Sequence, residues 1–243
     1  RNAGTYPNVG VDLYSKEPLE VGKITLEKQS ANPECTDNNN AYSLKGAEYS
    51  IYSDPECTDY IDKMITDEKG YAEKEGLKMG TYYVKESKAS EGYYLDKTVY
   101  KVTLPASSGK LEYQITSKEA PRLEAIKILL KKVDKDTGNS IPAGQGSLKG
   151  AEFIFKFYKG EYPEDTDPET LGKTVDKTWV FATDKKGVIQ FDKNFLISGD
   201  SFYMNDKGMP ALPVGTLVIT EKKAPNGYHI NPVTLIRNIK PEG

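Results

Sequence analysis

The sequence predicts an all-β protein of two tandem antiparallel β-sandwich domains. The first observation is an internal repeat, because Leu44-Lys-Gly-Ala-Glu-Tyr49 returns as Leu148-Lys-Gly-Ala-Glu-Phe153, 104 residues later. The second is the hydrophobic pattern: apolar residues alternate over short runs that end at Gly, Pro, Asn or Asp, and helical periodicity is almost absent. The 243 residues are enough for two domains with separate cores.

The alternating runs give the expected strands in chain order. In the first domain, residues 21–118, we expect strands at 23–29, 45–53, 61–66, 80–87, 98–104 and 111–117. In the second domain, residues 123–243, we expect them at 125–133, 150–158, 178–183, 187–191, 215–221 and 232–238. The Pro-containing join between the domains is short and semi-rigid. Residues 159–177 and 192–213 interrupt the pattern, so we expect surface excursions there, with room for a short helix.

Residues 1–20 are expected to hold the closing strand of a preceding domain and a linker. Their Ser-Lys-Glu-Pro sequence resembles the Ser-Lys-Glu-Ala-Pro sequence that ends the first domain, and the preceding residues match in pattern: Val11, Leu13 and Ser15 stand where Tyr113, Ile115 and Ser117 stand. The second domain has no such segment at its end, so we expect it to lack its last strand. We expect a segment resembling residues 9–16 of the next copy to complete it, along one polypeptide or between molecules.

Composition excludes several classes of function. The 33 basic and 36 acidic residues are interspersed and nearly cancel, which argues against nucleic acid as a partner. No run of eighteen apolar residues occurs, so we expect no membrane insertion in this fragment. The single histidine, His229, follows a Gly-Tyr turn and is expected at the surface. With no catalytic Ser-His-Asp or Cys-His set and no phosphate-binding loop, we expect no enzyme, no metal and no cofactor.

The two cysteines lie in five-residue segments of identical sequence. Cys35 lies in Pro33-Glu-Cys-Thr-Asp37 and Cys57 in Pro55-Glu-Cys-Thr-Asp59, and both turn-rich segments flank the strand expected near residues 44–51. We expect the two segments to meet at one end of a sheet and Cys35 to be joined to Cys57 by a disulfide, which would place the protein outside the cytoplasm. The alternative is two free thiols.

Five motifs occur in the same order in both halves of the chain. They are a first strand ending in Lys, Leu-Lys-Gly-Ala-Glu-aromatic, Thr-Asp-x-x-Gly, Gly-Thr-x-x-Val/Ile-x-Glu and Lys-Ala-x-x-Gly-Tyr. This order resembles the Cna-B/SpaA-type prealbumin-like domains of Gram-positive surface adhesins and pilins, over nearly the whole chain from about Val21. The resemblance implies two tandem reversed-immunoglobulin-like β-sandwich domains, export to the bacterial cell surface, and cell-wall anchoring through other parts of the parent protein.

The resemblance also implies an isopeptide bond, because many such domains join a Lys of the first strand to an Asn of the last, assisted by a buried acid. Alternation places Lys28 and Glu86 on the apolar faces of their strands, and Lys132 and Glu221 are their equivalents in the second domain. Burial lowers the pKa of a lysine and raises that of a glutamate, so a proton can pass between them and leave an amine nucleophile. The alternative is a buried Lys–Glu ion pair.

The acceptor position departs from the family pattern. Ser117 faces inward where Asn or Asp is expected, and a serine hydroxyl offers no acyl group. We therefore predict no isopeptide bond in the first domain and a non-covalent contact between Lys28 and Glu86. In the second domain Asn231 and Asn238 lie on the last expected strand or its lead-in, and the sequence leaves open whether either reacts.

These features favour a structural stalk or fibre-shaft module of a bacterial cell-surface adhesin or pilin, whose partners are neighbouring copies or domains of the same surface protein. The alternative is an adhesive second domain that binds host matrix protein or glycan through residues 159–177 and 192–213. Tyr158, Tyr162 and Tyr203 flank these loops and could stack on sugars. Trp179 is a further candidate, but the apolar residues that follow it favour a place in the core.

Overall fold

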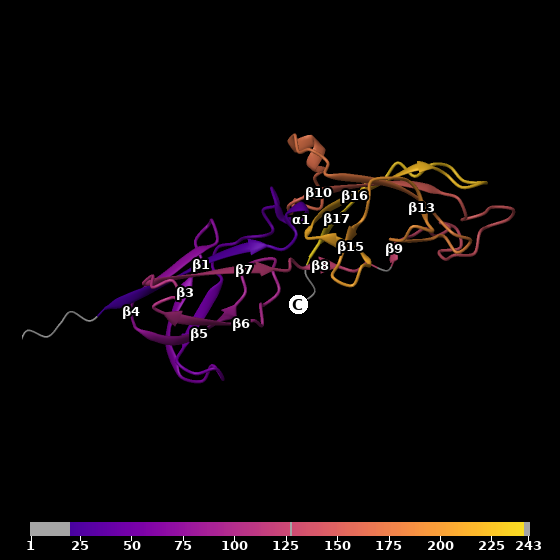
Figure 1. The fold of residues 1–243 in the computed structure, drawn as a ribbon. Coiled ribbons are helices and arrows are strands. Elements are labelled where there is room, and N and C mark those ends of the chain that lie inside the picture. The colour runs from indigo at the N-terminus through magenta and orange to yellow at the C-terminus, as the bar shows by residue number, and fades with distance from the viewer. Residues whose placement is uncertain (1–19, 127, 241–243) are drawn as a thin grey trace, which may run out of the picture.

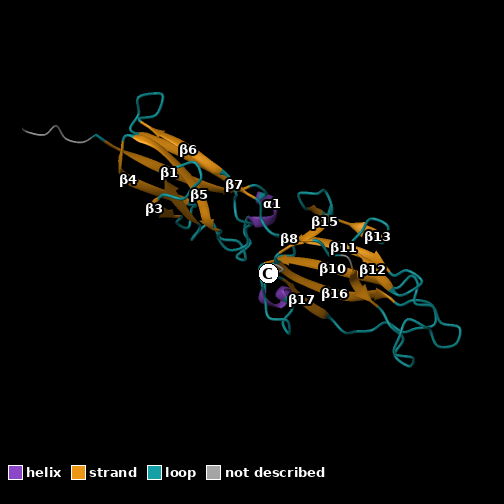
Figure 2. Cartoon of the chain, turned by 90° about the horizontal axis from the view of Figure 1, so that it is seen from below, coloured by secondary structure: helices purple, strands orange, loops and turns teal. Residues whose placement is uncertain are grey.

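A computed structural model describes residues 20–126 and 128–240 and shows two β-sandwich domains joined end to end (Figure 1). The predicted all-β class and tandem organisation are confirmed. Helix is confined, within these residues, to α1 (Pro33–Thr36) and the 3₁₀ turn η1 (Pro168–Leu171) (Figure 2). The predicted segment at residues 9–16 lies outside the described residues.

Domain one consists of two facing sheets. The first contains β4 (Tyr71–Lys78), β1 (Val21–Ser30) and β7 (Glu112–Glu119), in that order. The second contains β3 (Tyr60–Ile65), β2 (Glu48–Tyr52), β5 (Gly80–Lys88) and β6 (Val99–Leu104). Alternate residues of both sheets meet in one core that includes Ile24, Leu26, Ile51, Val84, Val102 and Ile115. Each such aliphatic side chain stabilises the fold by roughly 1.5–3 kcal/mol.

The first and last strands of domain one lie next to each other. β1 pairs antiparallel with β4 on one side and parallel with β7 on the other. The parallel register sets Leu26 opposite Ile115 and Lys28 opposite Ser117. Both backbone edges of β1 are therefore paired.

Domain two repeats this plan with a larger main sheet. That sheet runs β13 (Leu196–Gly199), β11 (Lys177–Ala182), β10 (Glu152–Lys159), β16 (Gly215–Lys223), β17 (Leu235–Ile239). Beside it lie the pair β12 (Val188–Gln190) and β9 (Ile128–Lys131), and the three strands β14 (Tyr203–Met204), β15 (Pro210–Pro213) and β8 (Leu123–Glu124). β9 is the counterpart of β1, but within residues 128–240 it pairs with β12 alone.

Two expectations about the elements were wrong. β4 was not predicted, because Gly76 at a φ of +74° and a run of charged residues hide its alternation. Residues 192–213 were expected to form a surface excursion, but they include β13, β14 and β15, and Tyr203 and Leu212 are buried. Residues 159–177 do form a largely exposed excursion and contain the short helical turn η1.

Candidate functional site

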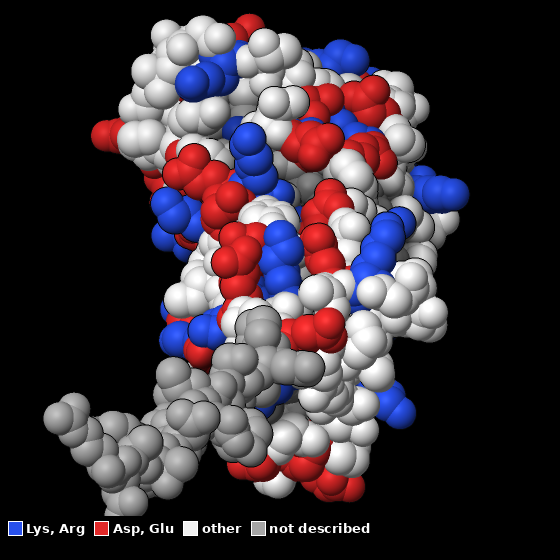
Figure 3. Space-filling model, turned by 60° about the vertical axis from the view of Figure 1, so that its left-hand side comes forward, with Lys and Arg blue, Asp and Glu red and all other residues white. Residues whose placement is uncertain are grey.

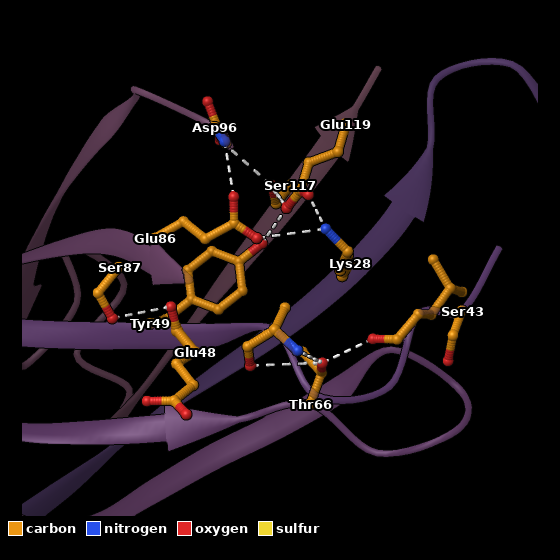
Figure 4. Close-up of polar contacts among 12 residues, drawn as sticks. Lys28, Ser43, Glu48, Tyr49, Thr66, Glu86, Ser87, Asp96, Ser117 and Glu119 are labelled. Atoms are coloured by element: carbon orange, nitrogen blue, oxygen red, sulfur yellow. Dashed lines mark hydrogen bonds and ion pairs between the residues drawn. The ribbon is translucent and has the colours of Figure 1, made fainter. Parts of the chain in front are cut away.

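The inward face of β1 ends in a buried lysine. Ile24, Leu26 and Lys28 are all 0% exposed, as their alternation predicted. Glu86, on the inward face of β5, reaches the lysine from the opposite sheet, and the Lys28 Nζ donates to Glu86 Oε1 at 3.4 Å (Figure 4). The predicted contact between Lys28 and Glu86 is confirmed.

Sequence reasoning missed a third member of this cluster, Glu119. Its carboxylate forms an ion pair with Lys28 and accepts hydrogen bonds from the hydroxyls of Tyr49 and, at 3.1 Å, Ser117 (Figure 4). The side chains of Lys28, Glu86 and Glu119 are all 0% exposed. The signal was available, because Glu119 follows Ser117 by two residues in β7 and therefore lies on the same face.

One buried ammonium group thus faces two buried carboxyl groups. Desolvation lowers the pKa of Lys28, although Glu86 opposes the change. Desolvation also raises the pKa of Glu86, against the hydrogen bond from the Asp96 N–H and the charge of Lys28. Electroneutrality in a buried site requires one protonated carboxyl, and the raised pKa of Glu86 fits that state. We therefore describe the cluster as an ion pair between Lys28 and Glu119 beside a readily protonated Glu86.

Ser117 lies where the sequence placed it. It is 0% exposed and stands opposite Lys28 in the parallel register, at the position of the expected acyl donor. Its hydroxyl bonds to Glu119 and lies 3.3 Å from Asp96 Oδ2. A hydroxyl has no acyl group to transfer to an amine, so the Lys–Asn reaction has no partner at this register position.

Domain two contains a simpler version of the cluster. Lys132 Nζ donates to Glu221 Oε1 at 2.8 Å, and Glu221 Oε2 accepts from the Asn231 N–H at 2.7 Å. The latter bond matches the 2.6 Å bond from the Asp96 N–H to Glu86 in domain one. Lys132 remains 13% exposed, and within residues 128–240 no carboxylate occupies a place like that of Glu119.

Neither asparagine considered for domain two lies in position to acylate Lys132. Asn238 of β17 lies opposite Thr216 of β16. Its side-chain oxygen accepts a hydrogen bond from the Thr216 hydroxyl, and its side-chain N–H donates to the Tyr162 carbonyl oxygen. Glu221 lies five residues further along β16, about 16 Å away at the usual rise of a strand. Asn231 is exposed, and its side-chain oxygen accepts from the Val233 N–H.

The second notable site is the junction between the domains, where α1 and the loop after it contact domain two (Figures 1 and 2). We call residues 34–42 the junction loop. The Asn39 side chain donates to the Val214 carbonyl oxygen at 2.9 Å, and the Tyr42 hydroxyl accepts from the Val214 N–H at 2.9 Å. That hydroxyl also donates to the Arg122 carbonyl oxygen at 2.7 Å.

Charged and apolar contacts extend this junction. Lys177 of β11 forms an ion pair with Glu34 at 2.8 Å, and Lys159 of β10 donates to the Asp37 carbonyl oxygen at 3.0 Å. Cys35 is 0% exposed and packs with the aromatic core of domain two. A Cβ at Gly160 would come within 2.6 Å of the Asn40 side chain, so glycine permits the close approach of the two domains.

The predicted disulfide was wrong, because Cys35 and Cys57 are both free thiols. Cys35 lies at the junction end of domain one. Cys57 lies in the β2–β3 turn at the opposite end, because the five residues of β2 carry the chain about 17 Å away from the junction. A disulfide needs Cα atoms within about 7 Å. Burial, helped by the charge of Glu34, also raises the pKa of the Cys35 thiol to about 12.

The aromatic residues proposed for glycan stacking are mostly internal. Trp179 is 0% exposed, which confirms its expected place in the core, and its indole N–H donates to the Asp200 carbonyl oxygen at 2.9 Å. Tyr158 and Tyr203 are 0% and 2% exposed, so neither presents a ring to solvent. Tyr162 alone of the three tyrosines is half-exposed.

Two further structural findings concern membranes and metals. In the described part of the chain no helix is long and apolar enough to cross a membrane. Across residues 20–126 and 128–240 no group of three or more His, Cys, Asp and Glu side chains could hold a metal ion.

Comparison with known proteins identifies the family. The SpaA prealbumin-like fold domain matches residues 14–119 and again 126–240. These ranges cover most of the chain, so the chain belongs to the SpaA family of prealbumin-like fold domains, as the motifs suggested. The family is one of structural domains and not of enzymes. No curated protein matches the chain.

Several solved structures are similar. The Bacillus anthracis TIE protein is 27% identical with a TM-score of 0.58, over 92% of this chain and 32% of that one. A streptococcal ancillary pilin is 20% identical with a TM-score of 0.35, over 93% of this chain and 60% of that one. BcpA, the major pilin subunit of Bacillus cereus, is 13% identical with a TM-score of 0.37, over 91% of this chain and 96% of that one. The chain thus spans about a third of the length of the TIE protein.

Proposed function

We propose that this chain is a shaft or stalk module of an adhesin or pilin on a bacterial cell surface. The observation that carries the proposal is the junction, where side chains of domain one bind the backbone and core of domain two. A stalk must transmit position along its length, and a junction of buried directed contacts restricts bending in a way that a flexible linker does not. Family membership supports the same role and an extracellular location.

The polar contacts of the junction are well placed to hold one orientation. Asn39 is 3% exposed and Tyr42 is 9% exposed, so water cannot replace their hydrogen bonds to Val214. Breaking one bond would leave a buried polar group without a partner, at a cost of about 1–3 kcal/mol. The linker adds backbone bonds, including Arg122 N–H to the Gly92 carbonyl oxygen at 2.7 Å. These bonds act together because they join the same two surfaces.

The surface supports a passive role as well. Lys, Arg, Asp and Glu side chains interleave over the face shown in Figure 3, without a large field of one sign. The adhesive alternative relies on the exposed excursion at residues 159–177, because the second loop that we considered lies partly in the core. Buried Tyr158, Trp179 and Tyr203 leave that alternative with little aromatic surface.

Two measurements on the whole chain test the proposed function. Small-angle X-ray scattering should fit an extended two-domain particle, and binding assays on immobilised matrix proteins and glycans should show no specific retention. Saturable binding that is lost when residues 161–175 are replaced by a short Gly-Ser loop would instead favour the adhesive role.

A further inference from the structure

Each domain has the same tight turn after one of its long strands, but the two turns carry different residues. The turn after β5 is Ser90-Glu-Gly-Tyr93, and the turn after β16 is Pro225-Asn-Gly-Tyr228. In both, the tyrosine N–H donates to the carbonyl oxygen of the first residue at 3.2 Å. The glycine has a φ of +83° in domain one and +85° in domain two. The backbone is therefore shared, and the side chain before glycine differs: Glu91 against Asn226.

An asparagine that is followed by glycine is chemically labile. The backbone nitrogen of the glycine can attack the side-chain carbonyl carbon of the asparagine, because a short tether joins the two groups and glycine has no Cβ to obstruct the approach. The attack closes a succinimide ring and releases ammonia. Water then opens the ring at either carbonyl, which leaves aspartate or isoaspartate in place of asparagine. A glutamate such as Glu91 has no amide nitrogen to release.

The structure leaves Asn226 and Gly227 free to react. Both residues are exposed. Within the described residues, neither the Asn226 side chain nor the Gly227 N–H takes part in a hydrogen bond. Two other loop asparagines are held, because the side chains of Asn139 and Asn205 bond to the backbone of their own loops. Asn226 is also the only asparagine in the sequence that glycine follows.

The same turn helps to hold a neighbouring loop of domain two in place. The Asn226 carbonyl oxygen accepts the Ser147 N–H at 3.1 Å, and a Cβ on Gly227 would meet the Cα of the glycine before Ser147 at 3.1 Å. The next residue, Tyr228, donates to Asp134 in the loop that follows β9. Isoaspartate would lengthen the main chain by one carbon and make the accepting carbonyl part of a free carboxylate. The turn could then not keep these contacts together.

We propose that Asn226 is a self-modifying site, which converts without an enzyme to aspartate and isoaspartate, and that the isoaspartate form loosens the loop from Asp134 to Ser147. Domain one has the equivalent bond, from the Ser43 N–H to the Glu91 carbonyl oxygen at 3.0 Å, but not the reactive amide. The chain thus acquires an age-dependent weak point in one domain and not in the other. This inference goes beyond the proposed stalk function, and neither depends on the other.

Peptide mapping of the aged protein tests the reaction. The full chain is kept warm at mildly alkaline pH in water labelled with heavy oxygen, which separates conversion during incubation from conversion during digestion. Trypsin releases residues 224–237, in which the only other asparagine, Asn231, precedes proline and so has no N–H to attack it. The mass of this peptide should rise by about 3 Da, of which about 2 Da is the heavy oxygen. A methyltransferase specific for isoaspartate should label it.

Matched peptides and variants give the controls. The peptide of residues 136–149 should convert at least about ten times more slowly, because the Asn139 side chain is held. Asn226→Gln should keep residues 224–237 at their original mass, since attack on the longer side chain needs a ring that forms more slowly. Glu91→Asn should introduce the reaction in residues 89–97. A parent peptide that stays unconverted, or conversion that persists in Asn226→Gln, would overturn the proposal.

Hydrogen–deuterium exchange tests the loosening separately. The amides of residues 134–147 should exchange at least about threefold faster in the converted protein than in the fresh protein, because the contacts of the turn are lost. Aged Asn226→Gln should match the fresh protein, and the amides of domain one provide an internal control. Equal protection of residues 134–147 in fresh and fully converted protein would contradict the structural half of the proposal.

Discussion

At the scale of single residues, the molecule's most unusual feature is one buried lysine shared by two buried glutamates. A buried ion pair contributes little to the free energy of unfolding by itself, but removing one of its two partners lowers that free energy strongly. Lys28 follows this rule because Glu119 and Glu86 approach it from different sheets. The contacts of Lys28 thus join β1, β5 and β7.

The first prediction concerns the charge of Lys28. Lys28→Ala should lower the free energy of unfolding by about 3–5 kcal/mol, because it leaves two buried carboxyl groups without their cation. Lys28→Met should lower it much less, since the volume is kept and the carboxyl groups can share protons. Lys23→Ala is the matched control on the same strand, where the half-exposed pair with Glu73 contributes roughly 0–1 kcal/mol. Urea unfolding measures all three.

The second prediction is that this cluster is non-covalent. The intact mass should equal that of the sequence, 27.0 kDa, and reduction should not change it. Condensation of Lys28 with Glu119 would release water and lower the mass by about 18 Da, since an amide would replace the ion pair. Such a loss, with a crosslinked peptide containing both residues, would show that the ion pair described here is the precursor of a bond.

The third prediction separates the two thiols. Cys57 is partly exposed and should react with a thiol reagent in the native protein, whereas Cys35 should react only after denaturation. Mass spectrometry after timed labelling measures both. Rapid labelling of Cys35 in the native protein would mean that the junction opens readily. If oxidation abolished the labelling of both cysteines, the expected disulfide between Cys35 and Cys57 would be supported after all.

At the scale of elements, the loop after β9 is organised by one carboxylate. Asp134 accepts the Tyr228 hydroxyl and the N–H groups of Asp136, Thr137 and Ala143. The bond from Tyr228, followed by the backbone donors, holds the pKa of Asp134 well below its ordinary value of 3.8. A depressed folded-state pKa gives stability that is present above the unfolded pKa and is lost as the pH falls below it.

The fourth prediction follows from that sign. Between about pH 5 and about pH 3 the free energy of unfolding should fall less steeply in Asp134→Asn than in the parent, because the variant has no carboxylate to protonate. Asp136→Asn, an exposed neighbour, should keep the parent's slope. An unchanged slope in Asp134→Asn would contradict the role given to this carboxylate.

How much of these elements the sequence predicts depends on whether their signals are local. Alternation located β1, β5 and β7 and the inward positions of Lys28, Glu86 and Ser117, because the period of a strand is set by its own backbone. β4 and the strands within 196–213 were missed because glycine and charged residues interrupt their pattern. Glu119 was not predicted, because the family pattern gives a role to the acceptor position, Ser117, and none to the residue two positions later.

The junction could not be predicted at all, for a physical reason. α1 is only four residues long, and the partner of Asn39 is Val214, 175 residues away in the chain. Nothing in the local sequence of residues 34–42 indicates which surface they will contact. The lack of a local signal for long-range position also explains the wrong disulfide prediction. It assumed that the similar segments around Cys35 and Cys57 lie at the same end of the sheet.

At the scale of the whole molecule, we infer that the junction makes the two sandwich domains behave as one rigid unit. Rigidity over this length turns a repeated domain into a shaft. The contacts of Asn39 and Tyr42 should decide the orientation, because they bind the backbone of domain two directly.

Pulsed electron spin resonance, which measures the distance between two spin labels, distinguishes a rigid junction from a flexible one. Spin labels at Lys101→Cys on β6 and Lys222→Cys on β16 are exposed and lie in different domains; Cys57→Ser removes the reactive native thiol. A rigid junction should give one narrow distance distribution, which broadens when Asn39→Ala and Tyr42→Phe are introduced together. A broad or multimodal distribution in the parent would show that the domains move independently and that the junction is not rigid.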